Sequence, residues 1–239
     1  MTQQPSDQTR GDSTAFFSGD QSAQMSQNEV TALCLKAARG AGMSWGLAEE
    51  AGFAASWLTA RGIDGPRHLL SHLTAAQGRA WGDLCPKVAP GAWQAATGKT
   101  LCPVVLGATL SDHATLPGGL TSGAILTGPV DHPILLCPFL SVIAEAAGGI
   151  VTLEWDGRRL DIDANGATSP AAFAALEGQT AVALRLSIRP GLAVHHPQTP
   201  SPAIAANTVT ALNAFALRTT VPASDASRAG AGAASNDND

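Results

Sequence analysis

Two Asp-His dipeptides and one cysteine are the residues whose types could support chemistry. Asp112-His113 and Asp131-His132 flank a short expected strand, and Cys137 follows soon after the second dipeptide. Residues at strand ends and turns can converge from different parts of a chain. Two histidines, two carboxylates and a thiol could form an acid–base–nucleophile set or a metal site. Their spacing does not distinguish these two sites, and ordinary polar residues of surface loops are the alternative interpretation.

Three of the four cysteines lie in the same tripeptide, Leu-Cys-Pro, with the thiols at Cys85, Cys102 and Cys137. A following proline holds the preceding residue in an extended conformation, and a small cysteine suits a buried strand end. If Cys137 instead caps a helix that begins at Pro138, the helix dipole would lower the pKa of its thiol. The cysteines form no CxxC pair, so the sequence does not indicate a zinc ribbon.

Two further features could bind ions. His68 and His72 are four residues apart, so they would share one face of a helix. That spacing can hold a metal, but it is more typical of the polar face of an amphipathic helix. Near the end of the chain, Arg228 stands beside alternating glycines and alanines, where backbone amides and the guanidinium could wrap an anion. The sequence does not identify a metal or a cofactor.

The composition excludes several classes of protein. Charged residues make up 14% of the chain and the net charge is −5, with no basic face, so nucleic acid is not an expected partner. Four cysteines in 239 residues do not make a disulfide scaffold. The longest apolar run, residues 134–144, is too short to span a bilayer, and the first residues do not resemble a signal peptide. We therefore expect a cytoplasmic protein that does not enter a membrane.

The first part of the chain is expected to form a layer of helices over residues 26–75. Ser26 and Glu29 form a capping box, S-x-x-E, and apolar residues follow at helical spacing. Ser44 would cap a second helix, and Gly65-Pro66 would open a third. Small residues on these helices would allow close packing.

Residues 101–190 are expected to form strands with interposed helices. The firmest signal is Asp156-Gly157 between two alternating runs, which predicts a two-residue hairpin that pairs Glu154 with Arg159. The other expected elements are strands over 104–110, 122–127 and 182–188, and helices over 138–147 and 170–178. The pattern predicts an α+β fold, a mixed α/β layer sandwich in which a helical N-terminal layer precedes a mainly antiparallel sheet.

The two ends of the chain differ in composition from its centre. Residues 1–25 lack periodicity and are expected to be a disordered extension, whereas residues 26–220 would form a single globular domain with a last helix over 207–217. The Gly/Ala/Asp-rich tail, 221–239, buries little apolar surface. We nevertheless predict that residues 221–232 dock on the globular body, because Arg228 could reach a carboxylate.

Two stretches resemble an uncharacterised bacterial family that is known only as a domain of unknown function. One stretch reads KAARGAG at residues 36–42 and WGLAEEAG at 45–52, and the other reads VPASDASR at 221–228 followed by GAG and DND. The resemblance covers residue 26 to the end and departs at Thr220, where the family often has tyrosine. It implies no established reaction. The first helices are also similar to those of sulfolactate/malate-type dehydrogenases, but the chain has no nicotinamide fingerprint.

These observations favour a cytoplasmic enzyme, or an enzyme subunit, that acts on a small-molecule ligand. Its site would combine acid–base or metal groups, a thiol and an anion clamp, from Asp112, His113, Asp131, His132, Cys137 and Arg228. The alternative is a non-catalytic binding or assembly subunit, whose helical layer packs on a protein partner or in a homo-oligomer. The sequence does not determine the substrate, the reaction type or the oligomeric state.

Overall fold

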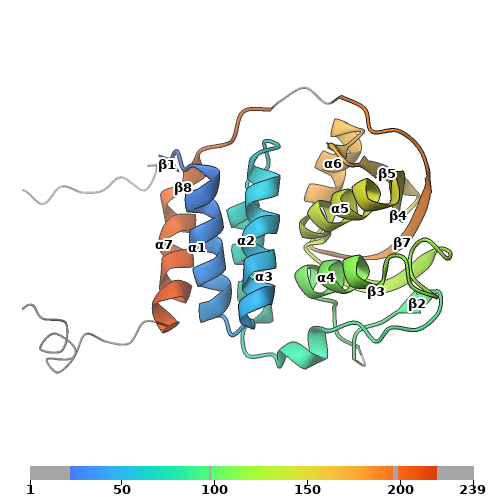
Figure 1. The fold of residues 1–239 in the computed structure, drawn as a ribbon. Helices are drawn as coiled ribbons and strands as arrows, with labels where there is room; N and C mark the ends of the chain where they lie inside the picture. The colour runs from blue at the N-terminus through green and yellow to red at the C-terminus, as the bar shows by residue number, and fades with distance from the viewer. Residues whose placement is uncertain (1–21, 97, 196–198, 220–239) are drawn as a thin grey trace, which may run out of the picture.

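The computed structural model describes residues 22–96, 98–195 and 199–219, and Figure 1 shows the arrangement of its elements. In these residues the α-helices are α1 (Gln27–Gly40), α2 (Trp45–Thr59), α3 (Gly65–Ala76), α4 (Pro103–His113), α5 (Cys137–Ala147), α6 (Pro170–Glu177) and α7 (Ala206–Ala216). The strands are β1 (Ser22–Ala23), β2 (Ala92–Trp93), β3 (Ile125–Asp131), β4 (Gly149–Trp155), β5 (Arg158–Asp163), β6 (Gly166–Ala167), β7 (Ala181–Pro190) and β8 (Ile204–Ala205). Short 3-10 helices η1 (Trp81–Leu84), η2 (Pro133–Leu136) and η3 (Leu217–Thr219) complete the set.

The expected helical layer is present and is extended by α7. The capping box forms as predicted, because the Glu29 amide donates to Ser26 Oγ at 3.3 Å and the Ser26 amide donates to Glu29 Oε2 at 2.7 Å. Helix α1 packs between α2 and α7, and α2 also contacts α3, α4 and α5. The helical layer thus lies directly against the helices that cover the sheet (Figure 1).

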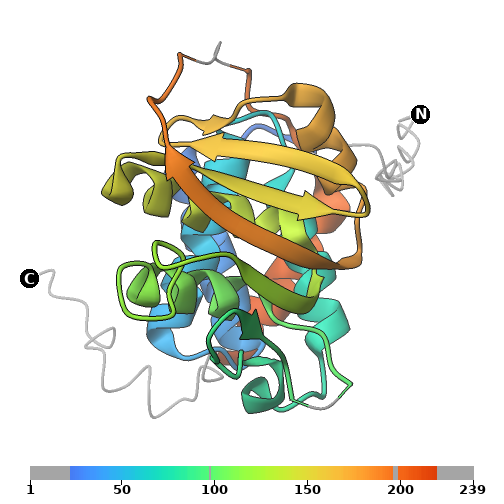
Figure 2. The ribbon, with the colours of Figure 1, turned by 90° about the vertical axis from the view of Figure 1, so that its right-hand side faces the viewer.

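The second half of the chain builds one six-stranded sheet in the order β2-β3-β7-β4-β5-β6. Only β2 and β3 run parallel, and every other neighbouring pair is antiparallel. Figure 2 shows the sheet in front of the helices, so that one of its faces is covered and the other is turned away from them. The structure therefore has the α+β architecture, with a mainly antiparallel sheet, that the sequence predicts.

The predicted hairpin is confirmed, but its ion pairs are not those expected. Strands β4 and β5 pair in the predicted register, with Trp155 opposite Arg158, and Asp156 and Gly157 both have positive φ. Glu154 lies opposite Arg159 in that register, yet its ion pair is with Arg185 of β7 at 2.7 Å. Arg159 instead binds Asp161 two residues along its own strand, at 3.0 Å. The third strand, β7, thus offers Glu154 a better-placed partner, and Arg159 finds its partner within β5.

The expectation of a strand over residues 104–110 is wrong, because this segment lies in helix α4. A short, continuous apolar run does not distinguish a buried strand from a buried helix. The deciding features are local, since Pro103 occupies the first helical position and Cys102 is the N-cap. Gly107 then lets the ring of Phe139 from α5 approach the helix backbone closely. The strand expected over 122–127 is displaced along the chain and ends at Asp131.

Most of the two terminal segments falls outside the described residues. Of the expected N-terminal extension, residues 22–25 are described, and Ser22 and Ala23 pair with Ala205 and Ile204 as a two-stranded ribbon. The predicted docking of residues 221–232 falls on residues that the structure does not describe. No helix of the described segments combines the length and apolar character that crossing a bilayer requires.

Candidate active site

A buried chain of hydrogen bonds joins a cysteine, a histidine and an aspartate at the boundary between the helical layer and the sheet. The Nε2 atom of His72 lies 3.1 Å from Cys102 Sγ, and its Nδ1 lies 2.7 Å from Asp131 Oδ2. His72 and Cys102 are each 1% exposed and Asp131 is 9% exposed. We call these three residues the Cys102 triad. Their order of contact is that of a nucleophile, a base and the group that orients the base.

Three separate elements bring the triad together. His72 lies on α3, whose N-cap residue Asp64 accepts a hydrogen bond from the Arg67 amide. Cys102 is the N-cap of α4, and Asp131 is the last residue of β3. The two chain segments that carry Cys102 and Asp131 run parallel, because Leu101 bridges to Val130. The cysteine and the carboxylate therefore emerge at the same end of neighbouring extended segments, facing α3.

The charges of the triad favour protonation of His72 despite its burial. Burial by itself lowers the pKa of His72, but the adjacent Cys102 sulfur and the Asp131 carboxylate outweigh it and raise the pKa to about 9. A carboxylate only accepts hydrogen bonds, so the short contact to Asp131 places a proton on Nδ1. The second proton then lies between Nε2 and the sulfur. A protonated imidazole beside a cysteine sulfur is the arrangement that activates cysteine nucleophiles.

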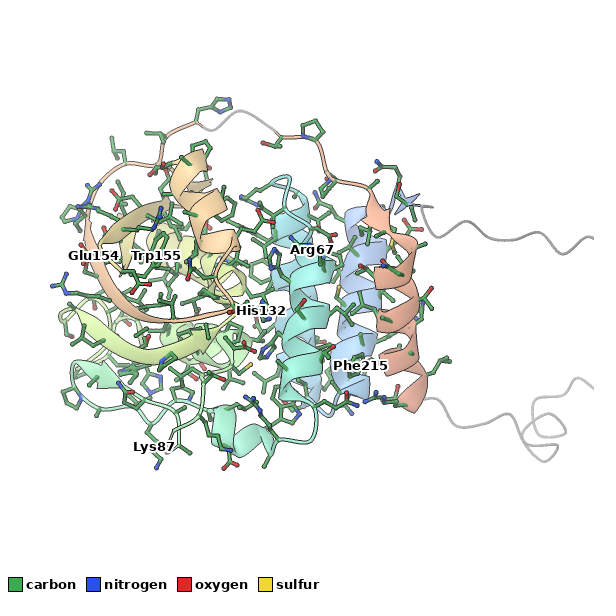
Figure 3. All side chains as sticks on the ribbon, turned by 180° about the vertical axis from the view of Figure 1, so that it is seen from behind. Arg67, Lys87, His132, Glu154, Trp155 and Phe215 are labelled. Atoms are coloured by element: carbon green, nitrogen blue, oxygen red, sulfur yellow. The ribbon has the colours of Figure 1, made fainter. Side chains whose placement is uncertain are left out.

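A second group of polar residues surrounds Asp131 on its other side. His132 follows it with a left-handed backbone, and its Nε2 lies 4.0 Å from Asp131 Oδ1. The His68 ring packs edge-on against the His132 ring at 6.3 Å, and its Nε2 lies 3.2 Å from Glu177 Oε1. Burial lowers the pKa of both histidines. Figure 3 shows His132 at the seam between the sheet part and the helical layer, below Arg67 of α3.

The turn that contains η1 covers the sulfur end of the triad. The Trp81 ring packs against the His72 ring at 6.2 Å, and its Nε1 donates to the Ala41 carbonyl at 3.2 Å. The partly exposed Cys85 follows η1, and its thiol donates to the Trp81 carbonyl at 3.3 Å. This cover separates the Cys102 sulfur from solvent.

The residues expected to form the site do not all lie together. Asp131 and His132 belong to the cluster just described, but Asp112 and His113 stand at the far end of α4 from Cys102. Asp112 is exposed, and the His113 Nδ1 donates to the Thr109 carbonyl at 3.0 Å while its ring meets Trp93. The helix separates them from the triad by roughly 16 Å.

Cys137 and Arg228 complete the expected set. Cys137 does not cap α5 but is its first residue, and burial raises the pKa of its thiol, opposite to the direction expected for a cap. Arg228 lies outside the described residues. Among the residues described, no group of three or more His, Cys, Asp or Glu side chains has the geometry to hold a metal ion.

Two residues of the triad, Cys102 and His72, were not predicted to belong to the site, although each lies in a recognisable sequence pattern. Cys102 belongs to the repeated Leu-Cys-Pro tripeptide, and His72 to the pair His68 and His72. The interpretation of that pair as part of the polar face of an amphipathic helix is wrong, since His68 is 3% exposed and His72 1%. A buried histidine needs a hydrogen-bonding partner, so a histidine on the buried face of a helix indicates a polar cluster inside the protein.

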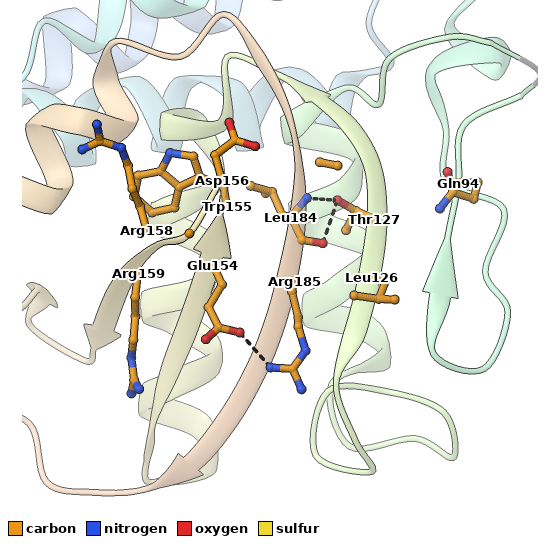
Figure 4. Close-up of a pocket in the computed structure, with 12 residues that line it drawn as sticks. Gln94, Leu126, Thr127, Glu154, Trp155, Asp156, Arg158, Arg159, Leu184 and Arg185 are labelled. Carbon is orange, nitrogen blue, oxygen red and sulfur yellow. Dashed lines mark hydrogen bonds and ion pairs between the residues drawn. The ribbon is translucent and has the colours of Figure 1, made fainter.

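Two surface pockets lie away from the triad. The pocket in Figure 4, of about 620 Å³, lies on the sheet face opposite the helices and is lined by residues such as Leu126, Glu154 and Arg185. The other, of about 710 Å³, lies between the end of α2 and α6, beside Arg61, Phe173 and Thr199. The residues that line them do not include a member of the triad.

A family model described as "Protein of unknown function (DUF3726)" matches residues 25–102. The resemblance to an uncharacterised family is thus confirmed for the first part of the chain, while the quoted C-terminal motif lies beyond the matched residues. No curated protein and no solved structure matches the chain. The matched segment contains α1 to α3 and ends at Cys102, so it carries two members of the triad, and Asp131 lies outside it.

Proposed function

We propose that the chain is a cytoplasmic enzyme in which Cys102 is the nucleophile for acyl transfer from a small carbonyl metabolite. The observation that supports the proposal is the unbroken hydrogen-bonded chain from Cys102 Sγ through His72 to Asp131. A cytoplasmic location suits this chemistry, because thiols are kept reduced there. The substrate class is an ester, a thioester or an activated amide.

The proposed reaction has two halves. In the first, the Cys102 sulfur forms a bond to the carbonyl carbon, and His72 gives the proton that it holds at Nε2 to the leaving group. In the second, His72 takes a proton from water, whose oxygen attacks the thioester carbon and releases the acid and the Cys102 sulfur. Asp131 keeps the imidazole in one orientation and stabilises its protonated form. The α4 amides of Val104 and Val105 would face the developing oxyanion, because the first turn of a helix leaves such donors free.

The proposal requires that the cover of the triad moves. Cys102 is 1% exposed, so a substrate must displace η1 or the side chains that follow it. The contacts that hold this turn include the Trp81 indole on the Ala41 carbonyl, the buried Leu84 side chain, and the backbone bond from the Cys102 amide to the Leu84 carbonyl at 3.0 Å. Outward movement of Trp81 would uncover the sulfur and the His72 ring together.

Acylation and alkylation of the thiols test the proposal. We expect iodoacetamide at pH 6 to modify Cys102 at least tenfold faster in the wild type than in His72→Gln, because the protonated His72 stabilises the thiolate. The Cys34 and Cys137 thiols are the internal controls, since both are buried and burial raises the pKa of each. We also expect p-nitrophenyl acetate to leave an acetyl group on Cys102 that disappears with time. Equal Cys102 rates in the two proteins would contradict the proposal.

The burial of all three residues of the triad favours a second function, that of a non-catalytic binding or assembly subunit. In such a protein the triad would be a buried polar network that fixes the packing of α3 on the sheet part. Wild-type Cys102 would then react no faster than Cys34 and Cys137, whereas His72→Gln would still unfold more easily. The same alkylation experiment therefore decides between the two functions.

A further inference from the structure

We infer that Cys85 and Cys102 form a redox-active pair, which low-molecular-weight disulfides of the glutathione type convert into a disulfide bond. The inference concerns the regulation of the proposed nucleophile, and in that respect it rests on the proposed function. The chemistry of the pair depends only on its geometry.

A backbone hydrogen bond holds the two cysteines close to each other. The Cys102 amide donates to the Leu84 carbonyl at 3.0 Å, and Cys85 is the next residue after that carbonyl. In a planar trans peptide the carbonyl oxygen lies close to the following Cα, so the Cα atoms of Cys85 and Cys102 are within about 7 Å of each other. Disulfide-bonded cysteines have Cα atoms about 4.4–6.8 Å apart. The charge of Cys102 also contributes, after burial, to a raised pKa of the Cys85 thiol, as expected for neighbouring sulfurs.

The repeated tripeptide gives both cysteines the same backbone form. Cys85 has φ −77° and ψ 145°, and Cys102 has φ −70° and ψ 124°, as the following prolines Pro86 and Pro103 favour. Cys137 carries the same tripeptide but is helical, with φ −54° and ψ −39°. The three Leu-Cys-Pro sequences therefore fall into two groups. Two are extended and joined by a backbone hydrogen bond, and the third is helical.

The two thiols differ in their exposure to solvent, and this difference determines which of them reacts first. Cys85 is partly exposed, whereas Cys102 is 1% exposed and held by His72. The Cys85 sulfur first attacks the disulfide, forms a mixed disulfide and releases one thiol. The Cys102 sulfur then attacks the Cys85 sulfur and expels the second thiol, which takes the proton from His72. The protein loses two electrons and two protons, and the small disulfide gains both.

The new bond would disable the triad. It draws the Cys102 sulfur away from His72 Nε2, so the nucleophile is no longer free and His72 keeps only Asp131 as a partner. Reduction by dithiothreitol or by reduced glutathione would restore the thiol. The pair is thus suited to stop acyl transfer under oxidising conditions.

Peptide mapping after treatment with oxidised glutathione tests the inference. Trypsin leaves residues 100–158 as one peptide, which contains both Cys102 and Cys137. The first measurement therefore uses the full chain with Cys137→Ala, so that a link to this peptide can involve only Cys102. We expect peptide 80–87 linked to peptide 100–158, and a loss of the link on reduction. A glutathione adduct that remains on Cys85 while Cys102 stays free would overturn the inference.

Single variants separate this inference from the proposed function. Cys102→Ser should stop at the mixed disulfide on Cys85, and Cys85→Ser should form no internal bond.

The second readout is acetylation of Cys102 by p-nitrophenyl acetate, which should fall at least tenfold when the wild type is oxidised and stay unchanged in Cys85→Ser. Link formation without any acetylation of the reduced protein supports the redox pair alone. Acetylation that survives oxidation, with no link formed, supports the nucleophile alone and contradicts the pair. Should Cys85→Ser fail to fold, Cys85→Ala with unchanged circular dichroism replaces it.

Discussion

His72 and Asp131 are 59 residues apart in the chain, and a 2.7 Å contact from Nδ1 to Oδ2 joins them across the boundary between the helical layer and the sheet. The contact is a buried polar link between α3 and β3.

Replacement of Asp131 by asparagine should weaken both the site and the fold. Asparagine keeps an acceptor but loses the negative charge, so the pKa of His72 should fall and Cys102 should alkylate more slowly at pH 6. The free energy of unfolding should drop by about 1–3 kcal/mol. Urea unfolding and thiol mass spectrometry measure the two effects. Asp112→Asn is the matched control, because Asp112 is exposed and its replacement should change stability by less than about 0.5 kcal/mol.

The stability contributed by His72 should depend on pH in a defined window. Its folded-state pKa of about 9 lies above the ordinary value of 6.5, so protonation stabilises the folded state fully below pH 6.5. That contribution is lost as the pH rises through 9, and it amounts to on the order of 3 kcal/mol. The difference in unfolding free energy between the wild type and His72→Gln should therefore shrink between pH 6 and pH 9.5. A constant difference would show that His72 is neutral in the folded chain.

The β4–β5 hairpin should be sensitive to the residue at its turn. Gly157 has φ +72° and its Cβ position is open, so Gly157→Val would suffer backbone strain alone, at a cost of about 1–3 kcal/mol. Gly157→Asn should cost less, since asparagine tolerates this conformation. Thermal unfolding of the two variants compares them under the same conditions. Equal melting temperatures would mean that the turn relaxes to another form.

Helices α1 and α7 should separate when a methyl group is added at Gly40. A Cβ at this position would overlap the Phe215 carbonyl, which belongs to the backbone and cannot rotate away. We expect Gly40→Ala to lower the unfolding free energy by about 1–3 kcal/mol or more. Gly46→Ala on α2 is the matched control, because its Cβ would meet nothing and alanine favours a helix. Destabilisation by both variants to the same extent would rule out the overlap as the cause.

Local features of the sequence predicted the local structure well. The Ser26 capping box and the Asp156-Gly157 turn each depend on neighbouring residues, and both formed in the predicted manner. The expectation of a strand over 104–110 was wrong because a short apolar run is compatible with a strand or a helix, and the features that favour the helix, Cys102 as N-cap and Pro103 at the first position, lie just before it. The triad could not be predicted for a different reason. His72, Cys102 and Asp131 meet only after three elements have packed, so their spacing in the sequence does not reveal the contact.

The packing of α1 against α7 has a consequence for how the chain acquires its structure. These two helices are separated by residues 41–205, so the outer face of α1 must wait until almost all of the intervening chain has been made and folded. Contacts between such distant segments slow folding and leave apolar surface open in the meantime. During synthesis, the apolar surface of α1 that α7 covers therefore stays exposed until α7 has been made.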